Sequence, residues 1–140
     1  KQSKKKVSVE KDLGALRGVT IEADPLQIQE VCHNILSNAY DAVEDLRGRI
    51  RIDAEVNDGY VNISVKDNGA GISKDDLAKI FDPFFTTKAK GTGLGLSVCR
   101  QIIHMHGGSI SVESEPGSGT SVVIALPRER SGKWPPAGSL

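Results

Sequence analysis

Two glycine-rich turns, separated by a short amphipathic run, constrain this chain more than any other feature. The first is the D-N-G-A-G-I stretch of residues 67–72, and the second is the G-T-G-L-G-L stretch of residues 91–96. Glycine lets a backbone approach another group closely and adopt positive φ. Because helical apolar spacing begins directly after the second turn, N–H groups at that helix start would face an anion. A carboxylate at one turn and a helix start at the other favour a ligand with a base at one end and phosphates at the other.

The strongest helix start in the chain is the segment Asp24-Pro25-Leu26-Gln27. Asp24 is a suitable N-cap, Pro25 fits the first helical position, and Gln27 can reach back to complete a capping box. Apolar residues then recur at helical spacing as far as Leu46. We therefore expect one long helix from Asp24 to about Leu46.

A polar stripe runs beside the apolar face of this predicted helix. It consists of Glu30, Asn34, Asn38 and Asp41, whose spacing places them on neighbouring positions of the helix surface. A solvated face is the simplest interpretation. Asparagine, however, is a mediocre helix former, and a solvated face is more readily built from Glu, Lys or Gln. The two asparagines therefore make the stripe a candidate binding surface.

A β-hairpin is predicted between residues 50–56 and 60–66, which alternate apolar and polar side chains around Asn57-Asp58-Gly59. Asp67 falls in step with the apolar positions of the second strand, such as Val65. Its carboxylate should therefore emerge on the side of the core, where an unpaired charge is costly. A ligand amino group would supply the donor that it needs.

Weaker patterns complete the fold prediction. The segment from Asp82 to about Thr92 has no periodicity, and all three phenylalanines lie at or beside its start, which favours a lid anchored at one end. The order of all the predicted elements along the chain predicts an α+β fold, with helices packed on one face of a mostly antiparallel sheet. The remaining predicted elements are strands at 7–12, 19–23, 110–112 and 122–126, a short helix at 74–81 capped by Ser73, and a helix from Leu94 to Met105 ended by Gly107-Gly108.

Composition limits the classes of function. A chain of 140 residues with 38% hydrophobic residues suits one soluble domain with a real core. Basic and acidic residues balance at 18 each, so nothing favours nucleic acid, and no apolar run is long enough for direct membrane insertion. Because the chain begins at Lys1 and its only methionine is Met105, we expect a piece of a longer protein. We expect a linker at 1–6, one domain at 7–127, and a disordered tail or linker at 128–140.

The cysteines and two of the histidines have simple interpretations. Cys32 and Cys99 occupy helical apolar positions, which is typical of small buried side chains with free thiols in a reducing compartment. His104 and His106 form an H-x-H pair near a predicted helix C-terminus. Since no set of Cys, His or carboxylate residues completes a metal site around them, we interpret both as cations facing the helix end.

Five segments occur in the order of the sequence boxes of a known family. They resemble the N, G1, F, G2 and final glycine-rich boxes of the histidine-kinase-like ATPases, and most resemble the catalytic, ATP-binding domain of two-component sensor histidine kinases. The resemblance covers about 7–127 and implies the Bergerat α/β sandwich with one ATP site under a flexible lid. The segments are H-N-I-L-S-N-A-Y-D-A (33–42), D-N-G-A-G-I (67–72), F-D-P-F-F-T-T-K (81–88), G-T-G-L-G-L (91–96) and G-S-G-T (117–120).

The resemblance implies a role for each matching residue. Asp67 would accept a hydrogen bond from the adenine amino group, whereas guanine presents an oxygen there and should be rejected. Asn38 matches the family's magnesium ligand, and Thr120 its threonine beside the base. Lys88 would reach the terminal phosphate from the lid, although a solvated lysine is the alternative. The other residues implied to bind the nucleotide are Asn34, Ala42, Gly69, Gly71, Ile72, Gly91, Thr92, Gly93, Leu94, Gly95 and Leu96.

Asn34 distinguishes between branches of this family. The ATP-hydrolysing relatives and the anti-sigma serine kinases carry a glutamate there as a general base, whereas an asparagine accepts no proton at neutral pH. The resemblance therefore implies a protein-histidine kinase domain that holds ATP and Mg²⁺, with Asn34 and Lys88 as its catalytic residues. Asp41 departs from the pattern, because some sensor kinases have a basic residue there, and Lys88 has to compensate.

The implied partners lie outside this chain. They are a histidine-bearing helical dimerisation domain of the parent protein and, downstream, a response regulator. The resemblance implies a cytoplasmic location for the domain, whether or not the parent is anchored in a membrane. Two alternatives stay open: an ATP-binding regulatory or serine-kinase (anti-sigma-like) module of the same superfamily, and a degenerate domain that binds nucleotide weakly and acts as a scaffold.

Overall fold

The structure, a computed structural model, describes residues 5–57, 59–83, 85 and 95–128. Its elements in chain order are β1 (Val7–Asp12), the 3₁₀ turn η1 (Gly14–Leu16), α1 (Pro25–Ala42), β2 (Gly48–Val56), β3 (Tyr60–Asp67), α2 (Lys74–Leu77), α3 (Gly95–Met105), β4 (Ser109–Glu115) and β5 (Gly119–Pro127). Within these described residues, no helix is both long and apolar enough to cross a membrane.

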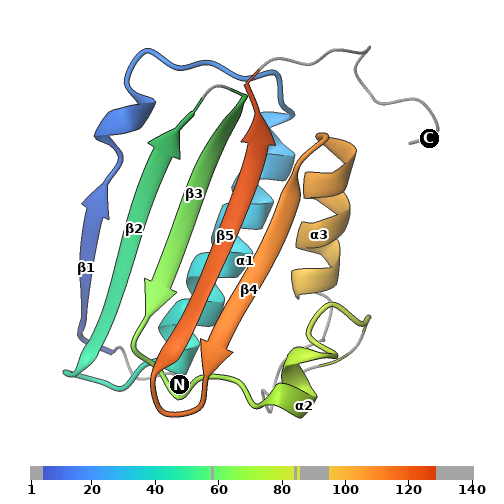
Figure 1. Cartoon of the computed structure of the whole chain (residues 1–140). Helices are drawn as coiled ribbons and strands as arrows, with labels where there is room; N and C mark the ends of the chain where they lie inside the picture. The colour runs from blue at the N-terminus through green and yellow to red at the C-terminus, as the bar shows by residue number, and fades with distance from the viewer. Residues whose placement is uncertain (1–4, 58, 84, 86–94, 129–140) are drawn as a thin grey trace.

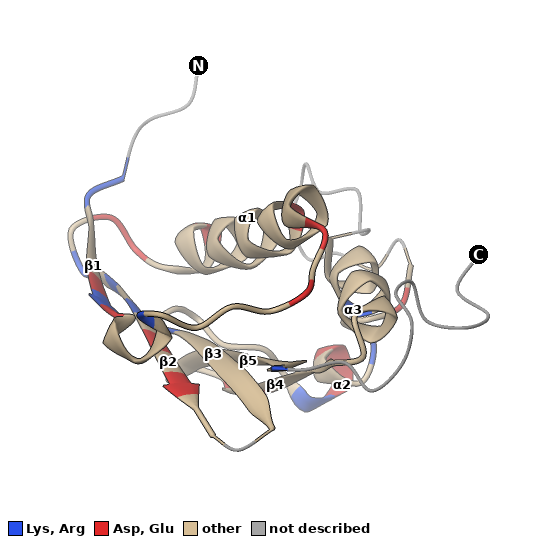
Figure 2. Cartoon of the chain, turned by 90° about the horizontal axis from the view of Figure 1, so that it is seen from above, with Lys and Arg blue, Asp and Glu red and all other residues tan. Residues whose placement is uncertain are grey.

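One five-stranded sheet, in the order β1-β2-β3-β5-β4, organises the molecule. Strand β1 pairs with β2 in parallel, and the other pairs are antiparallel. Helices α1 and α3 both pack against one face of the sheet, which we call the covered face; the opposite face is the open face (Figure 1 and Figure 2). The predicted α+β sandwich is therefore confirmed.

The core lies between these two helices and the covered face. It consists of apolar side chains from α1, α3 and the sheet that are almost inaccessible to solvent. These are Val31, Ile35 and Ala39 from α1, Cys99, Ile102 and Ile103 from α3, and Ile50, Val65, Ile124 and Leu126 from the sheet.

The β2–β3 hairpin forms where the sequence predicts it. The Asn57 side-chain oxygen accepts a hydrogen bond from the Tyr60 N–H at 3.1 Å, which closes the turn. Val61 and Val65 are buried on the covered face, and strand β3 ends two residues later at Asp67. The alternation therefore brings the Asp67 carboxylate to the covered face, as predicted.

Helix α1 begins as predicted, but its capping differs in one detail. Asp24 is the N-cap, and its Oδ1 accepts hydrogen bonds from the N–H groups of Leu26 at 3.0 Å and Gln27 at 3.2 Å. The capping-box prediction is wrong, because the Asp24 N–H donates to the His106 ring at 3.0 Å and is not left for the Gln27 side chain.

The His106 side chain links the end of α3 to the start of α1 through hydrogen bonds. The side chain is fully buried. Its Nδ1 lies 2.8 Å from the Ile102 carbonyl oxygen, and its Nε2 accepts from the Asp24 N–H. Because Nε2 is an acceptor, the ring is neutral with its proton on Nδ1. The prediction that His106 is a cation facing the helix end is therefore wrong, whereas His104 lies exposed in the last turn.

Helix α1 ends at Ala42, earlier than predicted. Val43 leaves the helix with φ −96° and ψ 158° and is buried. The Lys5 ammonium donates to the carbonyl oxygens of Tyr40 at 3.1 Å and Val43 at 2.9 Å, and the Ala70 N–H donates to the Ala42 carbonyl at 3.2 Å. Residues distant in sequence therefore cap the last carbonyls, and no further turn is needed to satisfy them.

Two shorter predictions also differ from the structure. Residues 19–23 form a connection without regular secondary structure between η1 and α1, and they pair with none of the described strands. Helix α2 ends at Leu77 and does not reach Phe81, because the chain continues in tighter turns such as the bond from the Asp82 N–H to the Lys79 carbonyl at 2.9 Å. The predicted cap of α2 is confirmed, and so are α3 and the β4–β5 hairpin.

Candidate functional site

Asp67 is a half-buried carboxylate at the end of β3. Burial raises its pKa, while the backbone N–H groups of Gly69 and Thr120 act in the opposite direction. The Gly69 N–H donates to Oδ1 at 2.8 Å. A carboxylate whose charged form is disfavoured by burial is stabilised by one more donor, which is what a ligand amino group supplies.

Three polar residues form a row across the covered face at this end of the sheet. The strand register places Asp67 of β3 opposite Thr120 of β5, and Thr120 opposite Ser114 of β4. The Ser114 and Thr120 hydroxyl oxygens lie 2.7 Å apart. The structure therefore brings together Asp67 and Thr120, two of the predicted site residues.

Ser114 is the member of this row that the sequence reasoning missed. Its hydroxyl oxygen accepts from the Ile72 N–H at 2.8 Å and donates to the Gly119 carbonyl at 2.9 Å. A signal was present in the sequence, because Ser114 falls in step with the covered-face residues Ile110 and Val112 of β4. A polar residue continuing an apolar alternation was the same signal that singled out Asp67.

The first glycine pair is required by close contacts within the protein. A Cβ on Gly69 would lie 2.4 Å from the Ala42 carbonyl oxygen. Gly71 has φ +77°, and a Cβ there would lie 2.0 Å from the Glu115 carbonyl oxygen. The glycines therefore let the turn after β3 fit between the end of α1 and the β4–β5 hairpin. That turn also brings the half-buried Ile72 to Ser114, and a direct contact of either glycine with a ligand stays a prediction.

The polar stripe of α1 divides into exposed and half-buried members. Glu30 and Asp41 are exposed, whereas Asn34 and Asn38 are half-buried. Burial raises the pKa of the Cys99 thiol in α3 to about 11, and a hydrogen bond from the Asn34 side chain acts in the opposite direction. The stripe therefore turns its asparagines toward α3 and is not a fully solvated face. Both cysteines are free, as predicted, although Cys32 is only half-buried.

Helices α1 and α3 run antiparallel, and their order places Asn38 near the start of α3. The N-cap Asp24 contacts His106, beyond the end of α3, and Asn34 contacts Cys99 near its middle. Asn38 lies one turn further along α1 and is therefore closer to Gly95, where α3 begins. A half-buried asparagine of α1 consequently lies near the N-terminus of α3, at the end of the sheet where β3 finishes with Asp67 (Figure 1).

The base of the predicted lid packs against α3. The Arg100 guanidinium lies over the Phe81 ring at 5.1 Å from its centroid, and Phe85 is half-buried. Gly95 and Leu96, which begin α3, are also half-buried. The predicted ligand residues Lys88, Gly91, Thr92, Gly93 and Leu94 lie outside the described residues.

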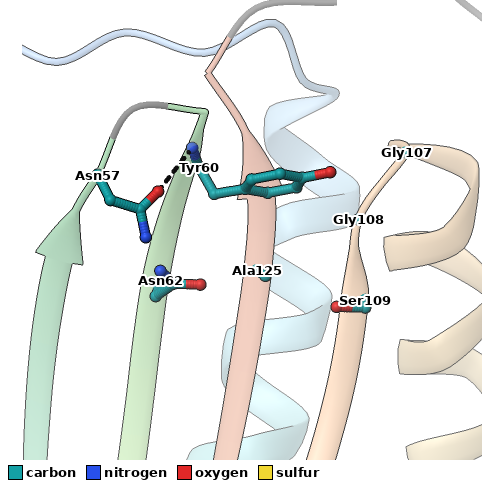
Figure 3. Close-up of a pocket in the computed structure, with 7 residues that line it drawn as sticks. All are labelled: Asn57, Tyr60, Asn62, Gly107, Gly108, Ser109 and Ala125. Atoms are coloured by element: carbon teal, nitrogen blue, oxygen red, sulfur yellow. Dashed lines mark hydrogen bonds between the residues drawn. The ribbon is translucent and has the colours of Figure 1, made fainter.

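Two hollows formed by described residues lie elsewhere. One, of about 360 Å³, is lined by Asn57, Tyr60 and Asn62 and by the start of β4, at the opposite end of the sheet (Figure 3). The other, of about 340 Å³, lies over the open face around Ser64 and Lys66. Neither includes Asp67, so chemistry and not cavity size identifies the candidate site. Among the described residues, no three His, Cys, Asp or Glu side chains gather to hold a metal ion.

A comparison with protein families decides where this arrangement belongs. Residues 23–130 match the family described as histidine kinase-, DNA gyrase B-, and HSP90-like ATPase. The chain belongs to this ATPase family. Its matched region contains the row of Asp67, Thr120 and Ser114, the α1 stripe and the whole of α3.

Curated proteins with similar sequences include sensor histidine kinases. The sensor histidine kinase ZraS of Escherichia coli K12 is 45% identical over 107 residues, which cover 76% of this chain and 23% of ZraS. The signal transduction histidine-protein kinase AtoS of the same strain is 48% identical over 108 residues, which cover 76% of this chain and 18% of AtoS. The chain thus spans less than a quarter of these relatives.

Solved structures of the ATPase family share the fold. The catalytic domain of the histidine kinase ThkA superposes with a TM-score of 0.77 at 36% identity, over 88% of this chain and 80% of that one. Full-length ShkA in complex with AMPPNP gives a TM-score of 0.73 at 28% identity, over 86% of this chain and 25% of that one. The α/β sandwich is therefore that of histidine kinase catalytic domains.

Proposed function

We propose that this domain binds Mg·ATP and donates the γ-phosphoryl group to a histidine on a separate helical dimerisation domain of its parent protein. The similar curated proteins are sensor histidine kinases, and the ThkA structure is a histidine kinase catalytic domain. The domain would then be the nucleotide-binding half of a protein-histidine kinase. Its phosphorylated partner would pass the group on to a response regulator.

The observation that carries this proposal is the half-buried Asp67 carboxylate. Its raised pKa means that burial penalises the ionised group until a donor approaches. The exocyclic amino group of adenine is such a donor. Guanine presents a carbonyl oxygen at that position, so two acceptors would face each other. ATP and ADP should therefore bind, whereas GTP should not.

The phosphates and the magnesium ion belong at the start of α3 in this proposal. Asn38 fits a magnesium ligand, because it carries an amide oxygen on a half-buried side chain and lies one helical turn from Asn34, which contacts α3. Mg²⁺ prefers hard oxygen ligands, and phosphates and waters complete its shell. The bound ion would neutralise phosphate charge during transfer. The backbone of Gly91, Thr92, Gly93 and Leu94, continuing to Gly95 and Leu96, would hold the phosphates, with Lys88 reaching the terminal one.

Asn34 favours phosphoryl transfer over hydrolysis. Its amide lies beside the Cys99 thiol, and an amide cannot take a proton from an attacking water at neutral pH. General-base assistance is typically worth about 10²–10⁴ in rate. Without it, Mg·ATP would persist in the site until an acceptor histidine arrives. Transfer would then depend on positioning and on electrostatic stabilisation of the phosphoryl group.

The test uses this chain together with the separately purified helical domain of its parent. With γ-labelled ATP and Mg²⁺, we expect label on that domain and almost no free phosphate when the domain is omitted. A helical domain whose acceptor histidine is replaced by glutamine is the matched control. Asn34→Glu restores a potential base and should raise phosphate release. Rapid hydrolysis by the wild type without any acceptor would contradict the proposal, and tight ATP binding without transfer would favour a scaffold.

A further inference from the structure

The Ser114 hydroxyl has three polar neighbours and only one proton. Its oxygen accepts from the Ile72 N–H at 2.8 Å, lies 2.9 Å from the Gly119 carbonyl oxygen, and lies 2.7 Å from the Thr120 hydroxyl oxygen. A carbonyl oxygen cannot donate, so the Gly119 contact is a hydrogen bond only if Ser114 gives its proton there. The proton between Ser114 and Thr120 must then come from Thr120.

This assignment satisfies every group in the cluster. Ser114 donates once and accepts twice, which is the full capacity of a hydroxyl. The opposite assignment, with Ser114 donating to Thr120, would leave two acceptor oxygens 2.9 Å apart with no proton between them. Half-buried acceptors that face each other in this way are costly. The geometry therefore requires the Thr120 hydroxyl to donate its proton to the Ser114 oxygen.

We infer that Ser114 is a positioning residue. It keeps the Thr120 hydroxyl as a hydrogen-bond acceptor and so strengthens the discrimination between purines with an amino group and purines with an oxo group at position 6. Because the Thr120 proton is committed to Ser114, its oxygen offers only lone pairs to a further partner. Thr120 stands directly opposite Asp67 in the strand register. Two neighbouring acceptors then face a bound base, which suits the amino group of adenine and opposes a 6-oxo group. This inference rests on the proposed nucleotide site.

The test compares Mg·ATP with Mg·ITP, because the base of ITP carries a 6-oxo group in place of the amino group. Dissociation constants are measured by calorimetry, with competition for the weaker ligand. In Ser114→Ala the Thr120 proton is released and can donate to the 6-oxo oxygen. We expect the preference for ATP over ITP to fall about threefold to tenfold, the usual worth of one hydrogen bond. Ser114→Thr keeps a hydroxyl and should keep the wild-type preference.

Ser111→Ala is the matched control, because Ser111 lies on the same strand and is exposed on the open face. A purely structural role for Ser114 would weaken both nucleotides equally and leave the ratio unchanged, which would overturn the inference. Ser114→Cys replaces the alanine variant if that variant does not fold, with the same expected fall. If the wild type itself fails to discriminate ATP from ITP, the proposed nucleotide site is wrong and the inference falls with it.

Discussion

The two faces of the sheet hold their polar residues in different ways. On the covered face, Asp67, Thr120 and Ser114 are half-buried, and Ser114 uses its hydroxyl fully on protein groups. On the open face, Arg51 forms ion pairs with Glu10 at 3.2 Å and Asp53 at 2.9 Å, yet its own side chain is 48% exposed. The first set is partly shielded from water, whereas Arg51 and Glu10 of the second set are exposed to it.

This difference indicates which residues can determine selectivity for a bound base. A polar group partly withdrawn from water loses much when its partner is removed, because water does not readily replace that partner. An exposed ion pair exchanges its partner for water at little cost. The covered face should therefore respond strongly to single substitutions, and the open face weakly.

The largest effect is expected for Gly71→Ala, which puts a methyl group against the Glu115 carbonyl beside the covered row. The clash and the positive φ together should lower the free energy of unfolding by about 2–4 kcal/mol. Chemical denaturation measures this loss. Gly117→Ala is the control, since Gly117 has φ +81° but no atom within 4 Å of the added Cβ. Equal losses in both variants would contradict the steric explanation.

The next effect concerns pH. The ionised Asp67 carboxylate is the stronger acceptor for adenine, so Mg·ATP affinity should fall, by at most about tenfold per pH unit, as the pH drops below the raised pKa of Asp67. The free protein responds in the opposite direction. Because the folded pKa lies above the unfolded one, protonation between the two values relieves the burial penalty and stabilises the fold. Titrations between about pH 7 and about pH 4.5 measure the affinity. Parallel profiles for the wild type and Asp67→Asn would exclude Asp67 as the titrating group.

A smaller effect is expected at the start of α1, the helix that packs on the covered face. Asp24→Ala removes the acceptor for the Leu26 and Gln27 N–H groups. It should cost about 1 kcal/mol of folding stability, the usual value for a lost N-cap. Asp24→Asn keeps a capping oxygen and should recover most of the loss in thermal unfolding. A full loss in the asparagine variant would mean that the carboxylate charge, not the cap, stabilises α1.

The smallest effect is expected on the open face. Arg51→Ala removes both described ion pairs of Arg51, and we expect no measurable change in the midpoint of thermal unfolding at physiological salt. Nucleotide affinity should be unchanged as well. A clear loss of stability would show that the open face is more than a solvated surface, and it would weaken the comparison between the faces.

Local sequence signals predicted much of this fold and part of the site. The alternation in β3 placed Asp67 correctly, and the Asp24-Pro25 segment located the start of α1, because both patterns act within a few residues. The end of α1 could not be predicted in this way. It is set by Lys5 and Ala70, which are distant in sequence and cap the last carbonyls.

The misassigned His106 and the missed Ser114 have the same physical cause. The position of His106 near the end of a helix suggested a cation. Its ring is neutral because Nε2 accepts a hydrogen bond from the Asp24 N–H at the start of α1. Ser114 acquires its role from three partners that meet only when β4, β5 and the turn after β3 come together. Such networks depend on tertiary contacts, which no local periodicity encodes.

The most direct test of the covered face as the base-binding surface is a calorimetric titration of Mg·ATP into the wild type, Asp67→Asn and Asp53→Asn. Both substitutions exchange a carboxylate for an amide, one on each face of the sheet. We predict that Asp67→Asn weakens binding by about 1–3 kcal/mol, the worth of a damaged charge-assisted hydrogen bond, whereas Asp53→Asn leaves it unchanged. Wild-type affinity in Asp67→Asn would contradict the assignment of Asp67 to adenine.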